Sequence, residues 1–197
     1  MKLIGLTGAH GTGKTTLAAS AAGEFGWEFA KTDVSGVYVK MGLDPRIHMS
    51  LMTRLEVQHA ILDLHYDQWT KLRSTCSVND HVVVTDRTPY CFIAFTLAEI
   101  SGYGKLTKEE DDAVMNYVEA CYRVAFELFD MVCYLPRSIP FVAATDKVQA
   151  VANESYREHW DMLIQGILFG RAPNHWEISA VQVAERLVEL KAVATAV

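Results

Sequence analysis

The chain has 197 residues, of which 50% are hydrophobic and 21% are charged, and its formal net charge is −6. The acidic total argues against broad electrostatic capture of nucleic acid or of an anionic membrane, and the apolar fraction can fill a core. The chain does not begin with a basic segment and an apolar run, and no apolar stretch reaches the roughly 18 residues of a membrane-spanning helix. We expect a cytoplasmic protein, in the host cytoplasm if the source is viral.

The first element in chain order is an apolar strand over residues 2–7, which runs directly into a phosphate-binding sequence. Residues 8–15 read Gly-Ala-His-Gly-Thr-Gly-Lys-Thr, the complete G-x-x-x-x-G-K-[ST] pattern. In this pattern backbone amides surround an anion, the lysine reaches the outer phosphates, and the Ser/Thr hydroxyl binds magnesium. A helix that begins near Thr15 would point its positive end at the phosphates. His10 fills a variable position, so we expect its side chain to face outward. The pattern predicts that a nucleoside triphosphate is bound by Gly8, His10, Gly11, Thr12, Gly13, Lys14, Thr15 and Thr16.

Short apolar runs alternate with helical periodicity along the rest of the chain, which favours an α/β fold with a mainly parallel sheet. Residues 82–84 are all valine, which is typical of a strand buried on both faces. The remaining strands are expected over residues 27–31, 81–85, 131–135 and 175–178. Helices are expected over residues 50–73, from Thr88-Pro89 to Gly102, from a capping box at Thr107 to Phe129, up to Phe169, and after a cap formed by Ser179 with Gln182.

The third strand leads straight into Asp86-Arg87-Thr88-Pro89, at the carboxyl end of the predicted sheet. Open α/β sheets bind their ligands at this edge. A carboxylate there can hold magnesium, and a fixed guanidinium can form paired hydrogen bonds to a phosphate. We therefore expect Thr15 and Asp86 to hold the metal and Arg87 to contact a phosphoryl group.

The phosphate loop, the step Asp86-Arg87-Thr88 and the aromatic-rich helix behind it resemble the small phosphate-loop kinases of nucleosides and nucleotides. Thymidylate kinases and deoxynucleoside kinases share this layout. The nearest resemblance is to the nicotinamide riboside kinase-like ATPases, a group often found in phages. In that group a lid cation is followed by Tyr-Arg-x-x-[Ile/Leu]-Asp, which is similar to Lys147 and to residues 155–161. Thr145-Asp146-Lys147 differs from the Asp-Gly-x-Arg that such lids often carry.

The resemblance implies a three-layer α/β/α sandwich of the P-loop NTPase type, with a five-stranded parallel sheet in the order 2-3-1-4-5 and a helical lid. It also implies ATP as donor and Mg²⁺ as cofactor. Lys147 and Arg157 are the candidate lid cations that would close over the phosphates. We expect one kinase domain over residues 1–197, with an acceptor-binding insertion at 33–75 and a lid at 137–157.

Two opposing sets of side chains bear on the acceptor. Asp33 follows the second strand on the same rim as Asp86, and a carboxylate there can take a proton from a hydroxyl acceptor. A phosphate monoester is already ionised at neutral pH and needs cations instead of a base. Tyr90 could stack on a nucleobase. The cations available for a phosphate acceptor are Arg46, Arg54, Arg73 and Arg87.

Because arginines outnumber the candidate bases, we favour ATP-dependent phosphoryl transfer to a nucleoside monophosphate, a deoxynucleotide in a phage-like salvage pathway. Lys14 would follow the transferred group, and Arg87 with a lid cation such as Arg157 would balance its charge. One alternative is a hydroxyl acceptor on a nucleoside, on nicotinamide riboside or on a hydroxymethylated pyrimidine in DNA. Another is a regulatory NTPase. A nucleic acid partner is less favoured, no membrane partner is expected, and a homodimer stays open.

Overall fold

The computed structural model describes residues 1–75, 81–140 and 153–197 of the chain. Its strands form one parallel sheet in the order β2-β3-β1-β4-β5, which confirms the expected strand order. The strands are β1 (Lys2–Thr7), β2 (Glu28–Ala30), β3 (Val82–Thr85), β4 (Met131–Tyr134) and β5 (His175–Glu177). The helices are α1 (Lys14–Phe25), α2 (Val34–Lys40), α3 (Leu51–Thr75), α4 (Pro89–Ile100), η1 (Ser101–Tyr103), α5 (Lys108–Leu128), α6 (Glu154–Arg171) and α7 (Val183–Ala196).

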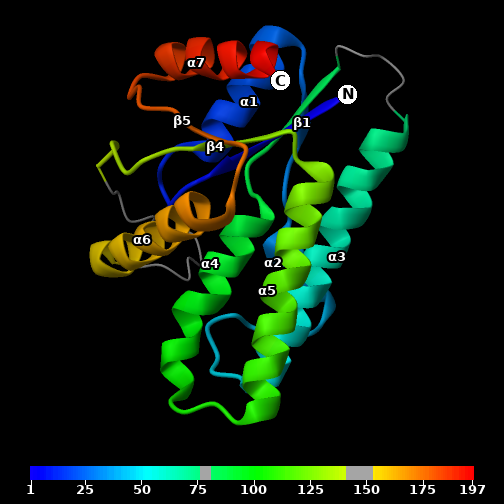
Figure 1. The fold of residues 1–197 in the computed structure, drawn as a ribbon, viewed down its shortest axis with the longest axis vertical. Coiled ribbons are helices and arrows are strands. Elements are labelled where there is room, and N and C mark those ends of the chain that lie inside the picture. The colour runs from blue at the N-terminus through cyan, green and yellow to red at the C-terminus, as the bar shows by residue number, and fades with distance from the viewer. Residues whose placement is uncertain (76–80, 141–152) are drawn as a thin grey trace.

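The helices cover the sheet on both faces, so the molecule has the three layers that the resemblance implies (Figure 1). Side chains alternate along the strands, and β1, β3 and β4 therefore each contribute side chains to two separate cores. On β3, Val83 packs into the core under α3, α4, α5 and α6, whereas Val82 and Val84 pack into the core under α1 and α7. A strand buried on both faces reads as a continuous apolar run, which explains the valines of β3.

The strand register brings distant chain segments to one edge of the sheet. In β1, Gly5 pairs with Thr85 of β3 and Thr7 pairs with Tyr134 of β4, while Ala30 of β2 also pairs with Thr85. All these strands are parallel, so the segments that follow them leave from the same edge. Residues 8–13, 31–33 and 86–88 meet there, and the candidate site lies among them.

Most predicted helices lie where the sequence placed them. The capping box at Thr107 is present, since its side chain accepts from the Glu110 N–H and the Glu110 carboxylate accepts from the Thr107 N–H. The expected cap formed by Ser179 and Gln182 is wrong. Gln182 precedes α7 without a side-chain bond, and the Glu189 carboxylate accepts from the N–H groups of Ser179 and Ala180.

One region differs from the expected layout in another way. The short helix α2 was not anticipated, and it begins directly after Asp33. Of the expected lid, residues 141–152 lie outside the described residues, and Lys147 is among them.

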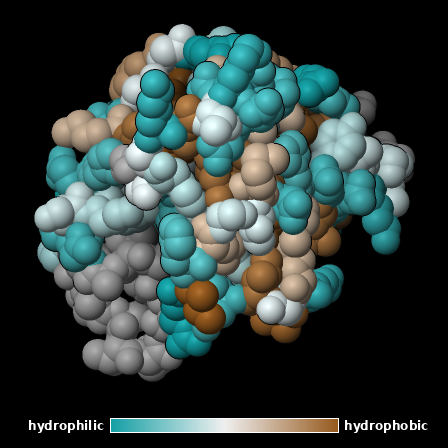
Figure 2. Space-filling model, turned by 90° about the horizontal axis from the view of Figure 1, so that it is seen from below, coloured by the Kyte–Doolittle hydropathy of each residue, from teal (hydrophilic) through white to brown (hydrophobic). Residues whose placement is uncertain are grey.

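On the face shown in Figure 2, hydrophilic and hydrophobic residues are mixed. Among the described residues, no helix has both the length and the apolar character needed to cross a membrane.

Candidate active site

The phosphate loop connects β1 to α1, and two glycines give it its shape. Gly11 and Gly13 have φ angles of 71° and 88°, in the left-handed region that other residues rarely adopt. These turns bring the chain around to α1, which begins at Lys14. The helix therefore starts at the loop, as expected for a site that holds anions.

Lys14 lies inside the curve of the loop and holds it from within. Its Nζ donates to the carbonyl oxygens of Gly8 and Ala9, at 2.8 and 2.6 Å. Burial lowers the pKa of Lys14 to about 8. The side chain is still mostly charged at neutral pH, so the loop carries a buried positive charge.

Asp86 joins the phosphate loop to the segment after β2. Its Oδ2 accepts from the Thr15 hydroxyl at 2.7 Å, and its Oδ1 accepts from the Thr32 hydroxyl at 2.9 Å and from the Thr32 N–H at 3.2 Å. A hydroxyl and a carboxylate in direct contact are the oxygen donors that a hard divalent cation prefers, so these residues fit Mg²⁺. The sequence analysis missed Thr32. It contacts Asp86 across 54 positions of the chain, and no local sequence pattern predicts such a contact.

A cleft of about 490 Å³ lies against these groups at the carboxyl edge of the sheet. Gly8 and Thr12, also expected to contact nucleotide, do not line it. The Thr12 hydroxyl is buried and donates to the Ala9 carbonyl at 3.0 Å, and the Gly8 carbonyl accepts from Lys14. The lining residues are His10, Gly11, Gly13, Lys14, Thr15, Thr16, Lys31, Thr32, Asp33, Val34, Ser35, Asp86 and Arg87.

Asp33 combines a structural contact with a place in the cleft. One carboxylate oxygen accepts from the Gly36 N–H at 2.9 Å, which caps the first turn of α2. The cap fixes the backbone at the end of β2 and holds the side chain at the cleft wall. Asp33 therefore lines the same cleft as the phosphate loop, and its contact with an acceptor stays a prediction.

The expectation that His10 faces outward is wrong. Its ring stacks on Trp160 of α6, with ring centroids 4.1 Å apart. The pKa of His10 is lowered to about 2, mainly by burial and further by the positive charges of Arg87, Lys14 and Arg157. The ring is therefore neutral. The Arg87 guanidinium lies 5.9 Å from the centre of the Trp160 ring. Trp160 therefore packs against both the phosphate loop and the arginine that follows β3.

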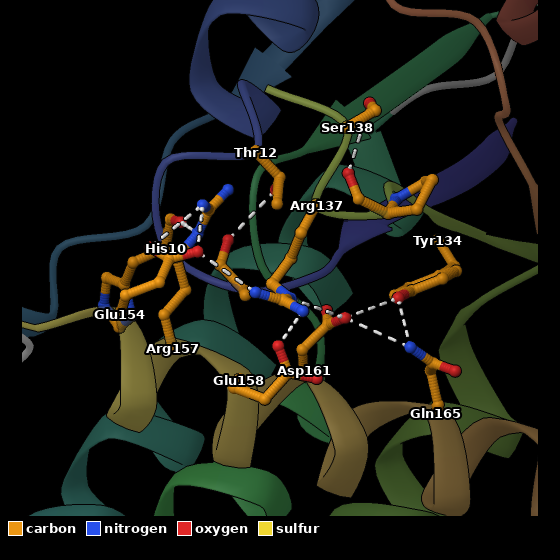
Figure 3. Close-up of polar contacts among 12 residues, drawn as sticks. His10, Thr12, Tyr134, Arg137, Ser138, Glu154, Arg157, Glu158, Asp161 and Gln165 are labelled. Atoms are coloured by element: carbon orange, nitrogen blue, oxygen red, sulfur yellow. Dashed lines mark hydrogen bonds and ion pairs between the residues drawn. The ribbon is translucent and has the colours of Figure 1, made fainter. Parts of the chain in front are cut away.

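Arg157 was expected as a lid cation, and its contacts lie on the outer side of the phosphate loop. Its Nε donates to the His10 carbonyl at 2.8 Å and its Nη2 donates to the Ile139 carbonyl at 3.0 Å. Glu154 pairs with the same guanidinium (Figure 3). The side chain is 1% exposed and is absent from the cleft lining.

The segment after β4 carries a second arginine that the sequence analysis did not single out. Arg137 pairs with Glu154, Glu158 and Asp161 of α6, as Figure 3 shows. The Tyr134 hydroxyl and the Gln165 amide also donate to Asp161, at 2.9 and 3.1 Å. This network fixes residues 136–139 against the first turns of α6.

The three arginines expected in the acceptor insertion lie apart from one another. Arg46 is exposed and pairs with Asp44, while Arg54 is buried and pairs with Glu99 and with the Tyr38 hydroxyl. Arg73 pairs with Asp130, directly before β4 and hence at the amino edge of the sheet.

None of the three lines the cleft. Tyr90, expected to stack on a base, is 3% exposed and packs against Tyr122, with ring centroids 6.0 Å apart.

Comparison with known proteins identifies a family that matches most of this chain. A family described as an AAA domain matches residues 3–186. No curated protein sequence gives a significant match.

Among solved structures, deoxyadenosine kinase from M. mycoides, with the products dCMP and a flexible dCDP bound, superposes with a TM-score of 0.67 at 15% identity, covering 99% of this chain and 100% of that one. The NadR protein in complex with NAD and AMP-PNP superposes with a TM-score of 0.65 at 17% identity, covering 98% of this chain and 49% of that one. NadR in complex with NR gives a TM-score of 0.66 at 16% identity, with coverage of 100% and 52%. At these identities the likeness is one of fold.

Proposed function

This chain belongs to the AAA domain family, and on that premise we propose that it is an ATP-dependent phosphotransferase of the nucleoside and nucleotide kinase class whose acceptor group is a hydroxyl. The observation that carries the proposal is the composition of the cleft. Residues of the phosphate loop line it together with Asp33, Asp86 and Arg87. A donor site, a metal site and a carboxylate facing them are the parts that phosphoryl transfer to a hydroxyl requires.

The preference for a phosphate acceptor depended on the arginines of the insertion. Their observed contacts do not favour such an acceptor. Arg46, Arg54 and Arg73 each pair with a carboxylate away from the cleft. Among the described residues, the cations that line the cleft are Lys14, Lys31 and Arg87, and two carboxylates lie beside them. A dianionic acceptor would meet the repulsion of Asp33, whereas a neutral hydroxyl would gain a base.

The structural neighbours support the same class of acceptor. One is a deoxyadenosine kinase, and another is NadR, seen with NR in one structure and with AMP-PNP in another. We accordingly propose a nucleoside-type hydroxyl as the acceptor in this protein. The match to NadR covers 49% of that chain, so only the part that this fold represents bears on the proposal.

Several of the cleft residues have roles in the proposed reaction. The loop amides and Lys14 hold the phosphates of ATP, and Thr15 with Asp86 would hold Mg²⁺, which supplies charge neutralisation at the transferring phosphoryl group. Asp33 accepts the proton of the acceptor hydroxyl as the hydroxyl oxygen bonds to the γ-phosphorus, and the bond from that phosphorus to the β,γ-bridging oxygen breaks to release ADP. Arg87 faces the charge that develops on the transferred group.

The experiment that tests the proposal is an acceptor panel. The protein is incubated with Mg-ATP and separate nucleosides, nucleoside monophosphates, nicotinamide riboside and hydroxymethylated DNA, and ADP release is measured. Strong stimulation by a nucleoside or by nicotinamide riboside is the expected result. Stimulation only by monophosphates would restore the deoxynucleotide kinase hypothesis, and stimulation only by a protein would indicate a regulatory NTPase. Stimulation only by the DNA would move the hydroxyl from a small molecule to a polymer.

A further inference from the structure

Two buried arginines from the last two helices hold the phosphate loop from its outer side. Arg186 of α7 donates from Nη1 to the Thr12 carbonyl at 2.6 Å and from Nε to the Ala180 carbonyl at 2.8 Å. Arg157 of α6 donates to the His10 carbonyl at 2.8 Å. Both side chains are 1% exposed. Such burial of a guanidinium is costly unless its donors are bonded, and here the partners include loop carbonyls.

The geometry of the peptide unit gives these contacts a consequence inside the cleft. The carbonyl of His10 and the N–H of Gly11 belong to one peptide unit, and so do the carbonyl of Thr12 and the N–H of Gly13. The described residues contain no cis peptide, so the carbonyl and the N–H of each unit point in opposite directions. An arginine that draws a carbonyl outward therefore turns the linked N–H toward the cleft.

The surroundings of Gly11 and Gly13 agree with this arrangement. Both residues line the cleft, whereas Thr12 between them does not. In the part of the chain that the structure describes, no protein acceptor is bonded to either N–H group. A Cβ added at Gly13 would lie 3.1 Å from Nη1 of Arg186, so the loop and the guanidinium are in close contact.

The same guanidiniums also bind the segment that follows β4. Nη2 of Arg186 donates to the Ser138 hydroxyl at 2.9 Å, and Nη2 of Arg157 donates to the Ile139 carbonyl at 3.0 Å. Each arginine thus joins the phosphate loop, residues 138–139 and a C-terminal helix. A guanidinium has five donors spread over a fixed plane, so it can hold acceptors that lie apart from one another, whereas the three donors of a lysine all sit on a single nitrogen.

We propose that Arg186, together with Arg157, is a positioning residue for ATP: it fixes the peptide units that direct the Gly11 and Gly13 N–H groups at the phosphates. Neither arginine is among the residues that line the cleft. Both act through the loop, by holding and polarising the peptide units whose N–H groups become the phosphate donors. The inference refines the donor site of the proposed function, and it requires only that ATP binds to the loop.

The test compares three variants with the wild-type protein, each also checked by thermal unfolding. Arg186→Lys keeps the positive charge but cannot hold Thr12, Ala180 and Ser138 together. The dissociation constant of Mg-ATP, measured by calorimetry, is expected to rise about tenfold to hundredfold, which corresponds to the loss of one charged hydrogen bond. The KM of the acceptor at saturating ATP is expected to change less than about threefold.

Two controls separate positioning from a general effect on the fold. Leu190→Val removes a methylene from a fully buried side chain on the same helix, so it lowers stability without touching the loop. Ser138→Ala removes the partner of Nη2 and leaves the bond from Nη1 to Thr12 in place. Both variants are expected to bind Mg-ATP within about threefold of wild type.

Three results would overturn the inference: wild-type affinity in Arg186→Lys, an equal loss of affinity in Leu190→Val, or an equal loss in Ser138→Ala. Failure of the wild-type protein to bind Mg-ATP would overturn the inference and the proposed function together. If ATP binds and Arg186→Lys weakens it, but no acceptor stimulates ADP release, the proposed function fails while the positioning role stands.

Discussion

The two sides of the cleft differ in how firmly the protein holds their polar groups. On the donor side Lys14 is bonded to two carbonyls, Asp86 to two threonines, and the loop to buried arginines. On the acceptor side Lys31, Asp33 and Ser35 are exposed, and Asp33 is held through its bond with Gly36. We therefore propose that the donor site is preorganised for ATP and that the wall facing the acceptor is adaptable.

The largest effect is expected at the centre of the donor side. In Lys14→Ala, transfer should fall at least about 10³-fold, because a charge that follows the phosphoryl group is lost in a water-poor site. Turnover is measured beside circular dichroism and thermal unfolding. The matched control is Lys191→Ala on α7, whose ammonium lies over the Phe25 ring. Normal turnover in folded Lys14→Ala protein would contradict the assigned mechanism.

The acceptor side is tested by Asp33→Asn. Asparagine caps a helix about as well as aspartate, so α2 is preserved while the base is lost. With a hydroxyl acceptor, kcat should fall about 10²-fold to 10⁴-fold. The control is Asp44→Asn, which makes the same change at a carboxylate of the insertion whose partner among the described residues is exposed Arg46. A fall of less than about threefold in Asp33→Asn would favour a phosphate acceptor.

Arg87 lines the cleft together with Asp33 and the phosphate loop, and its loss should separate transfer from hydrolysis. In Arg87→Ala, phosphoryl transfer to the acceptor is expected to fall about 10-fold to 10³-fold. ATP hydrolysis without acceptor should fall less, since water needs no positioning by this side chain. Both rates are measured on one preparation. Equal losses would mean that Arg87 serves the donor alone.

The smallest effect is a pH dependence that arises on the donor side. Because burial lowers the pKa of Lys14 to about 8, kcat/KM for ATP should fall about tenfold per pH unit above that value. Between pH 8 and its ordinary pKa of 10.5, the unfolded chain binds more protons at this lysine than the folded chain does. The contribution of Lys14 to the free energy of unfolding therefore rises with pH. A flat profile from pH 7 to 10 in folded protein would contradict the assignment.

The two sides also differ in how much of them the sequence predicts. The phosphate loop is a local sequence pattern. Strands such as β3, with its run of valines, and helices such as α5 can likewise be recognised from a few neighbouring residues. The sheet order follows from a resemblance that the family match and the solved structures confirm. Local patterns and a shared layout were therefore sufficient for the fold and for the place of the phosphate loop between β1 and α1.

The remaining contacts join residues that are far apart in the chain, and no local pattern encodes them. Thr32 orients Asp86, His10 stacks on Trp160, and Arg186 reaches Thr12 across 174 positions. The insertion arginines show the opposite case. Charge counting placed them in one cluster, but each has a carboxylate partner of its own, which composition alone does not reveal.

The bond between Arg186 and Thr12 also concerns how the protein is made. Thr12 is synthesised and leaves the ribosome long before Arg186, because 174 positions separate the two residues. During synthesis the N-terminal β1 and the loop after it lack the support of the final helix. Nascent chains are therefore expected to acquire nucleotide affinity late, when that helix has left the exit tunnel.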